Sequence, residues 1–177
     1  MTLLVVLSAG PAAQVKALQA DLGQPLARAL RWTWDDRWQH LGPGEDPNSA
    51  LQQLQPSARE PALAQRPALL GLPLDPGLPL AGGGHWAEAL GAWRQPALLV
   101  FSAEQLQTGA PAAMTALLKG WQVPLVGLVQ WGEAWASAER RRDGLPWLGA
   151  LQAEQISPEQ ASQLRSALDL ALRCRLS

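Results

Sequence analysis

The chain has 177 residues and a mass of 19.0 kDa, and 47% of its residues are hydrophobic, so it has the size and composition of one globular domain. Fourteen Lys and Arg residues stand against fifteen Asp and Glu residues, and the net charge of −1 argues against non-specific nucleic-acid binding. The single Cys174 excludes an intramolecular disulfide and a thiolate zinc cluster. No apolar run approaches the roughly 20 residues that span a bilayer. We therefore expect one cytoplasmic domain, residues 1–177, without membrane or nucleic-acid partners.

The amino-terminal part predicts a strand, a helix and a second strand. Residues 2–7 form a short apolar run, which is typical of a strand buried on both faces. Residues 12–22 carry apolar side chains at spacings of three and four, and Gly23 at the end of this pattern predicts that the helix stops there. Residues 27–34 alternate in polarity and predict a half-buried strand near a sheet edge.

The region 41–84 is rich in helix and strand breakers, because it contains 8 of the 15 prolines and 7 of the 16 glycines. We expect irregular structure there apart from a short helix near 48–54 and a strand over 68–74. Pro73 argues against a central position for that strand, since proline cannot donate a ladder hydrogen bond.

The second half alternates between helical and strand patterns. Helices are predicted at 86–93, 111–119 and 132–142, and strands at 97–101, 125–129 and 147–151. Ser157, Pro158 and Gln160 form the start signal of a last helix, with an N-cap, a proline at N1 and a capping-box glutamine. This alternation predicts an α/β fold, a doubly wound and mainly parallel sheet of about five to six strands with helices on both faces.

The first strand-to-helix turn has the spacing of a phosphate-binding loop. Gly10 and Lys16 occupy the positions of the first glycine and the lysine in such a loop. A working loop needs glycine before the lysine and Ser or Thr after it to ligate magnesium, but this chain has Val15 and Ala17 there. The alternative is an ordinary turn with a lysine on the helix surface.

Several further candidate positions also fit ordinary structural roles. Asp75 follows a predicted strand and is a candidate metal ligand, although Asp-Pro-Gly is also a turn sequence. The Trp-rich segment 32–38 suggests stacking on a ligand, but Trp must also do most of the aromatic packing in a chain with no Tyr and one Phe. His85 fits a helix start, and the basic run 140–142 fits a solvated helix end.

The order of these features resembles dethiobiotin synthetase and its superfamily of P-loop proteins, which includes the partitioning ATPases and cobyrinate amidases. The likeness lies in the strand before Asp75, the glycines 82–84 and three strands with their flanking residues, Gln95-Pro-Ala-Leu-Leu-Val-Phe101, Val123-Pro-Leu-Val-Gly-Leu-Val-Gln-Trp-Gly132 and Leu145-Pro-Trp-Leu-Gly-Ala150. The resemblance implies a nucleotide site at Gly10 and Lys16 and a magnesium ligand at Asp75. It places Trp131 where the family has an asparagine that reads adenine.

The departures from this family fall on its working residues, namely Val15, Ala17, Trp131 and the missing Lys-Pro motif after the second strand. Our first hypothesis is therefore a pseudoenzyme that binds a small ligand or a protein partner, or forms a homodimer, without hydrolysing ATP. The alternative is an active ATP-dependent synthetase or ATPase, a carboxylase and cyclo-ligase of the dethiobiotin synthetase type. In that hypothesis Lys16 contacts the phosphates of ATP and Asp75 holds magnesium.

Overall fold

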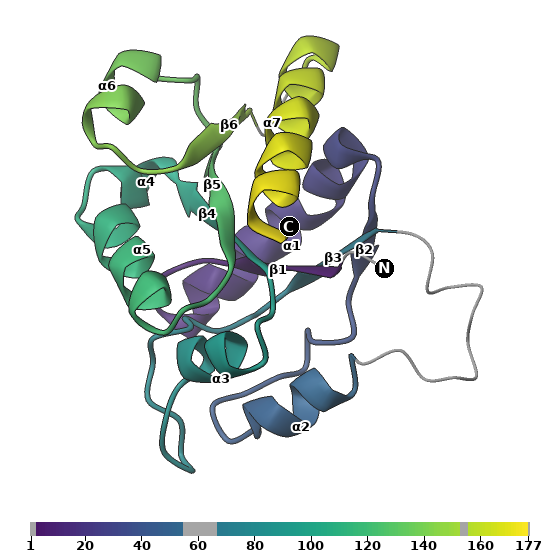
Figure 1. Cartoon of the computed structure of the whole chain (residues 1–177), viewed down its shortest axis with the longest axis vertical. Helices are drawn as coiled ribbons and strands as arrows, with labels where there is room; N and C mark the ends of the chain where they lie inside the picture. Colours follow the sequence, from purple (N-terminus) through teal and green to yellow (C-terminus); the bar gives the residue numbers. More distant parts are fainter. Residues whose placement is uncertain (1–2, 55–66, 153–155, 177) are drawn as a thin grey trace.

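The computed structural model describes residues 3–54, 67–152 and 156–176 (Figure 1). The elements in chain order are β1 (Leu3–Leu7), α1 (Ala12–Leu30), β2 (Thr33–Asp35), α2 (Pro47–Gln52), β3 (Ala68–Gly71), α3 (Trp86–Ala92), β4 (Ala97–Ser102), α4 (Ala103–Leu106), α5 (Ala110–Gly120), β5 (Leu125–Trp131), α6 (Ser137–Arg142), β6 (Trp147–Leu151) and α7 (Pro158–Leu176).

The described strands form one six-stranded sheet in the order β2-β3-β1-β4-β5-β6, and every neighbouring pair is parallel. This confirms the predicted doubly wound α/β fold. The three longest apolar runs, β1, β4 and β5, all lie inside the sheet, as their sequences predict. Inner strands of a parallel sheet are covered on both faces, so neither face of such a strand tolerates charge.

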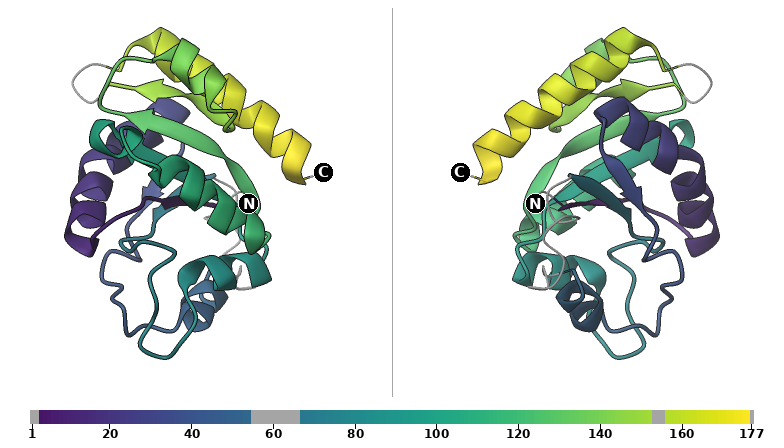
Figure 2. Two further views of the ribbon diagram at one scale, coloured as in Figure 1. Left: turned by 90° about the vertical axis from the view of Figure 1, so that its left-hand side faces the viewer. Right: turned by 90° about the vertical axis from the view of Figure 1, so that its right-hand side faces the viewer.

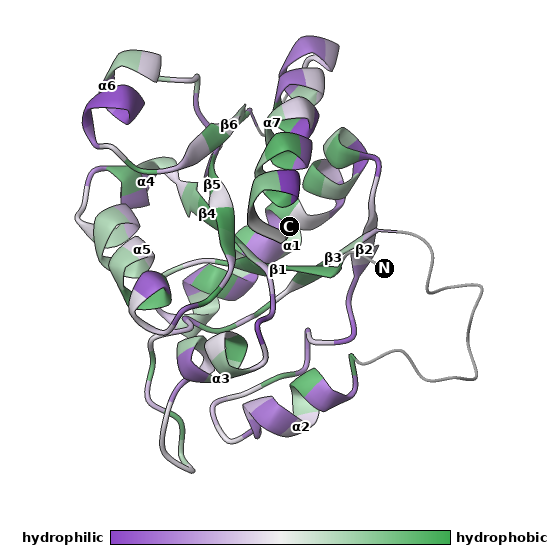
Figure 3. Cartoon of the chain, in the orientation of Figure 1, coloured by the Kyte–Doolittle hydropathy of each residue, from purple (hydrophilic) through white to green (hydrophobic). Residues whose placement is uncertain are grey.

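Helices cover both faces of the sheet. On one face, α1 and α7 pack against alternate residues of the strands, such as Leu4 and Val6 of β1. On the other face, Val5 and Leu7 join a core that includes Trp86, from α3, and residues of α2 and α5. Figure 2 shows α7, in yellow, running across the β5 and β6 end of the sheet. In Figure 3 the inner strands are hydrophobic while α6 is largely hydrophilic.

Helix α1 is longer than the sequence pattern predicts. It continues through Gly23 and Pro25 and ends at Leu30, where Arg31 adopts the left-handed conformation with a φ of 59°. The prediction of a helix end at Gly23 is therefore wrong, and so is the strand over 27–34. Leu26, Ala27 and Leu30 are buried against the sheet, and this packing continues the helix past two residues that usually end one. Strand β2 is confined to Thr33–Asp35.

The remaining predictions differ from the structure mainly at element ends. Strand β3 stops at Gly71 and does not reach residue 74, and α6 begins at Ser137 and not at residue 132. The one-turn helix α4 was not predicted. The start of α7 is confirmed, because Ser157 Oγ accepts from Gln160 N at 3.1 Å and Gln160 Oε1 accepts from Ser157 N at 3.2 Å. None of the described helices is long and apolar enough to cross a membrane.

Candidate functional site

The turn after β1 is tied to the turn after β3 by one carboxylate. Gly10 has a φ of 117°, which favours glycine, and its N–H donates to Asp75 Oδ2 at 2.7 Å. The other carboxylate oxygen, Oδ1, accepts from Gly77 N at 2.8 Å. Asp75 thus has the role in its own turn that Asp-Pro-Gly predicts, and it also binds the backbone of the predicted phosphate loop.

The loops after β1 and β4 are also joined. Ser8 Oγ donates to Val100 O at 3.0 Å, and the buried side-chain amide of Gln105 donates to Ala9 O. In a doubly wound sheet, ligands usually bind where neighbouring strands send their connections to opposite sides, which here is between β1 and β4. In this chain, the side-chain hydrogen bonds of Ser8 and Gln105 connect the two loops at that position.

The start of α1 differs from a phosphate cradle in its chemistry. Val15 N donates to Pro11 O, so Val15 already belongs to the first helical turn, and its side chain is fully buried. The Ala17 side chain lacks the hydroxyl oxygen with which Ser or Thr would ligate magnesium. With the Gly10 N–H bound to Asp75, these residues do not fit a magnesium nucleotide.

Two hollows lie on opposite flanks of α1, and Lys16 lines one of them. This cavity has a volume of about 240 Å³ and lies between α1 and the carboxyl ends of β2 and β3. It is lined by residues of α1, of the β2 end and of the β3 end: Lys16, Gln19, Ala20, Trp34, Asp35, Gln39, Gly71 and Pro73. We call it the Lys16 cavity.

Gln19 gives the Lys16 cavity a fixed hydrogen-bond acceptor. Its side-chain nitrogen Nε2 donates to Val6 O and to Leu72 O, both at 2.9 Å, and the residue is only 6% exposed. A flipped amide would place its oxygen against two carbonyl oxygens, so the orientation is unambiguous. Oε1 is therefore the remaining polar atom of the Gln19 side chain, and no residue in the described part of the chain donates a hydrogen bond to it.

Gln19 was not predicted as a site residue, although the sequence contains a signal for it. It lies four residues after Val15 and three before Leu22, on the buried stripe of α1. A polar side chain on such a stripe needs hydrogen-bond partners, and those partners mark a position with a specific role.

The wall of the Lys16 cavity is an indole ring beside a bare backbone. A Cβ atom on Gly71 would lie 1.8 Å from Gln19 Oε1 and 2.8 Å from Trp34 Cζ2. Glycine at this position therefore lets Gln19 and Trp34 approach the backbone of β3. Any side chain there would fill the space that the two groups share.

The charges at the Lys16 cavity partly cancel. Asp35 Oδ2 accepts from Arg37 Nε at 2.7 Å and pairs with the guanidinium Nη2 at 2.6 Å. Asp35 Oδ1 accepts from Arg37 N at 3.0 Å. With Asp35 neutralised by Arg37, the ammonium group of Lys16 leaves this flank of α1 with a positive charge.

Trp131 lies in the second hollow, on the other flank of α1. This open hollow of about 570 Å³ is lined by α1 and the ends of β4 and β5, and it contains three carboxylates, Asp21, Glu104 and Glu133. Trp131 is buried, and its Nε1 donates to Asp21 Oδ2 at 2.7 Å. We call this space the acidic hollow.

Of the four predicted site residues, the structure thus brings Gly10 and Asp75 together. It places Lys16 and Trp131 in separate hollows on either side of α1.

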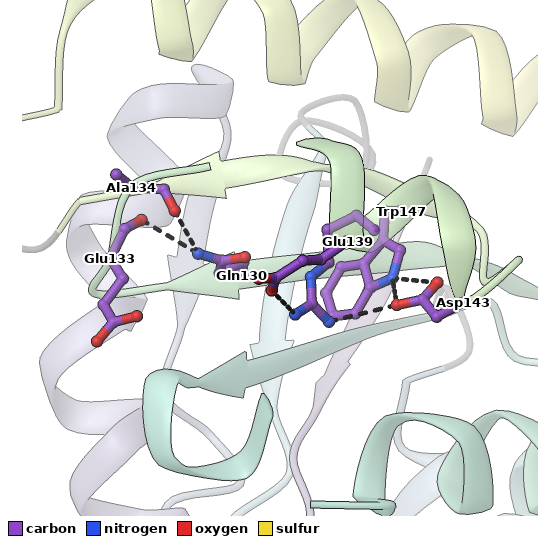
Figure 4. A network of polar contacts seen from close by, with 7 residues as sticks. Gln130, Glu133, Ala134, Glu139, Asp143 and Trp147 are labelled. Atoms are coloured by element: carbon purple, nitrogen blue, oxygen red, sulfur yellow. Dashed lines mark hydrogen bonds and ion pairs between the residues drawn. The ribbon is translucent and has the colours of Figure 1, made fainter. Parts of the chain in front are cut away.

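The basic run 140–142 is only partly the solvated helix end that its sequence predicts. Arg140 has a side chain that is only 10% exposed, it lies over the Trp147 ring at 5.1 Å, and it pairs with Glu139 and Asp143 at 3.3 Å. Trp147 Nε1 donates to Asp143 in turn, as Figure 4 shows. Arg140 therefore holds α6 against β6, while Arg141 and Arg142 are exposed.

The histidines and the cysteine have no shared site. His85 is the N-cap of α3, as predicted, and its Nδ1 accepts from Glu88 N at 3.1 Å. Cys174 is exposed on α7. Within residues 3–54, 67–152 and 156–176, no group of three or more His, Cys, Asp or Glu side chains could hold a metal ion.

A comparison of the sequence with protein-family models and with curated proteins finds no match in either set.

Proposed function

We propose that this chain is a non-catalytic binding protein on a P-loop-like α/β fold, a pseudoenzyme relative of dethiobiotin synthetase. The observation that carries the proposal is the hydrogen bond from Gly10 N to Asp75 Oδ2. In a nucleotide-binding loop the backbone N–H groups face phosphate oxygens, but in this turn the N–H of Gly10 already binds an internal carboxylate. The negative charge of Asp75 at this turn disfavours a second anion there.

The surroundings of this turn support the same conclusion. A polyphosphate approaching the turn would meet the negative charge of Asp75, and the acidic hollow beside it carries three more carboxylates. Lys16 is the cation that the family uses on phosphates, yet here it lines a cavity together with Trp34 and Asp35. Binding without phosphoryl chemistry suits this arrangement, with a small ligand or a protein partner as the bound species.

The proposal is tested by calorimetry of the purified full chain with magnesium and ATP, together with an assay for released phosphate. We expect no turnover and no dissociation constant at or below about a micromolar. Lys16→Ala is compared with Lys119→Ala, which removes the other lysine of the chain from an exposed position on α5.

Tight ATP binding or turnover that is lost in Lys16→Ala but kept in Lys119→Ala would instead establish the enzyme hypothesis. The remodelled loop would then work with Lys16 on the phosphates and Asp75 on magnesium. Unchanged and negligible nucleotide binding in all three proteins supports the non-catalytic function.

A further inference from the structure

We propose that the Lys16 cavity binds a small aromatic carboxylate that carries an N–H donor group. The inference rests on the proposed binding function and names the ligand class and the place where it binds. Three features of the cavity each select one part of this ligand.

The first feature is the acceptor Gln19 Oε1. Two backbone carbonyls hold the amide nitrogen, so the oxygen cannot turn away, and no group of the described chain donates to it. Gln19 is only 6% exposed, and its Oε1 is an acceptor at the cavity to which a ligand can donate. The ligand therefore has an amino or amide N–H at this end.

The second feature is the flat, apolar wall. The Trp34 ring lies over the bare backbone of Gly71, and Pro73 completes this side of the cavity. An aromatic ring of the ligand would pack against the indole in an offset or edge-on arrangement. The volume of about 240 Å³ is enough for a single substituted ring.

The third feature is the positive charge of Lys16. Asp35 is the one carboxylate among the residues that line this cavity, and Arg37 binds both of its oxygens. The exposed ammonium group of Lys16 is thus free to pair with an anion at the cavity mouth. The acidic hollow on the other flank of α1 repels an anionic ligand. A carboxylate is therefore expected to bind in the Lys16 cavity and not in the acidic hollow.

The test uses 4-aminobenzoate as the probe, because it combines a planar ring, an amino donor and a carboxylate. Calorimetry with the full chain at about 1 mM ligand is expected to detect binding at one site. Benzoate lacks the donor and is expected to bind about tenfold more weakly, since the hydrogen bond to Gln19 Oε1 would then be absent. Aniline lacks the carboxylate and is expected to bind more weakly as well.

The variants assign the binding to this cavity. Lys16→Ala is expected to weaken 4-aminobenzoate binding at least about threefold, whereas Lys119→Ala leaves it unchanged. Lys16 is exposed, so both variants are expected to fold, and circular dichroism verifies this. Equal affinity for 4-aminobenzoate and benzoate, equal effects of the two lysine variants, or no binding at all would each overturn the inference.

These outcomes are distinct from failure of the proposed function. Tight magnesium-ATP binding would disprove the non-catalytic proposal, whatever 4-aminobenzoate does. If neither magnesium-ATP nor 4-aminobenzoate binds, the inferred site is wrong but the non-catalytic proposal stands.

Discussion

The indole of Trp34 lies directly against the backbone of Gly23 in α1. A Cβ atom on Gly23 would lie 2.6 Å from Trp34 Cε2 and 2.8 Å from Cζ2, closer than real side chains approach one another. The same ring contacts Gly71 of β3, so two glycines create the space that the indole fills between helix and sheet.

This contact predicts that Gly23→Ala destabilises the protein. Alanine in a helix is ordinarily more stable than glycine by up to about 1 kcal/mol, but here its methyl group collides with a packed ring, and overpacking costs about 1–3 kcal/mol. In a Trp34→Ala background the collision is absent, and Gly23→Ala is expected to become stabilising. Urea unfolding of the four proteins of this double-mutant cycle measures the effect. Stabilisation by Gly23→Ala in both backgrounds would contradict the contact.

The course of α1 could not be predicted from local sequence. Gly23 and Pro25 are both typical of helix ends, and the helix continues past them because Leu26, Ala27 and Leu30 are buried against the sheet, which depends on the tertiary structure. The inner strands β1, β4 and β5 were predictable, because short continuous apolar runs in a chain with β-α alternation are typical of strands buried on both faces.

The candidate site was predictable only in part. Loop spacing suggested Gly10 and Lys16, and the position after a predicted strand suggested Asp75. The sequence could not show that the Asp75 carboxylate binds the Gly10 N–H, because that contact depends on the turn after β3. Gln19 was missed because its role follows from where its two amide hydrogens go, and the helical pattern does not contain that information.

Asp75 is expected to stabilise the junction of two loops. Asp75→Ala removes the charged acceptor of two backbone N–H groups, those of Gly10 and Gly77, and we expect a loss of about 1.5–3 kcal/mol in the free energy of unfolding. Asp75→Asn retains one carbonyl acceptor and is expected to lose less. Asp36→Ala, at an exposed aspartate, is the control and is expected to have little effect. Similar stabilities of all three variants would contradict this role.

The N-cap of α2 makes stability depend on acid pH. Hydrogen bonds from Ser49 Oγ, Ser49 N and Asn48 N, with the first the largest cause, hold the pKa of the Asp46 carboxyl below its ordinary value of 3.8. A lowered pKa means that the folded state favours the charged form. The stabilisation is therefore fully present above pH 3.8 and is lost as pH falls through the lowered pKa.

Asp46→Asn keeps a capping oxygen but removes the titration. The difference in unfolding free energy between the native chain and Asp46→Asn is thus expected to be constant at neutral pH and to shrink in acid. An NMR titration checks the cause directly: Ser49→Ala should raise the pKa of Asp46 toward its ordinary value. An unchanged pKa in that variant would show that Ser49 is not the main cause.

The pair Trp131 and Asp21 is expected to couple β5 to α1. Trp131→Phe removes the donor to a carboxylate at 2.7 Å and leaves a small void, and we expect a loss of about 1–3 kcal/mol. Asp21→Asn keeps an acceptor and is expected to cost less than Asp21→Ala. If Trp131→Phe and Asp21→Ala are additive in a double-mutant cycle, the hydrogen bond does not contribute.

Introducing the Gly and Thr that a phosphate-binding loop would have at positions 15 and 17 is expected to destabilise the chain without creating an ATP site. Val15 lies in the first turn of α1 with its side chain fully buried, so Val15→Gly removes core packing and lowers helix propensity, at a cost of about 2–4 kcal/mol. Ala17→Thr adds the hydroxyl for magnesium at an exposed position and alone is expected to cost little. In the double variant the Gly10 N–H still binds Asp75, so calorimetry with magnesium and ATP should detect no micromolar binding. Tight binding by the double variant that disappears in Lys16→Ala would mean that Val15 and Ala17, and not Asp75, close this loop to nucleotides.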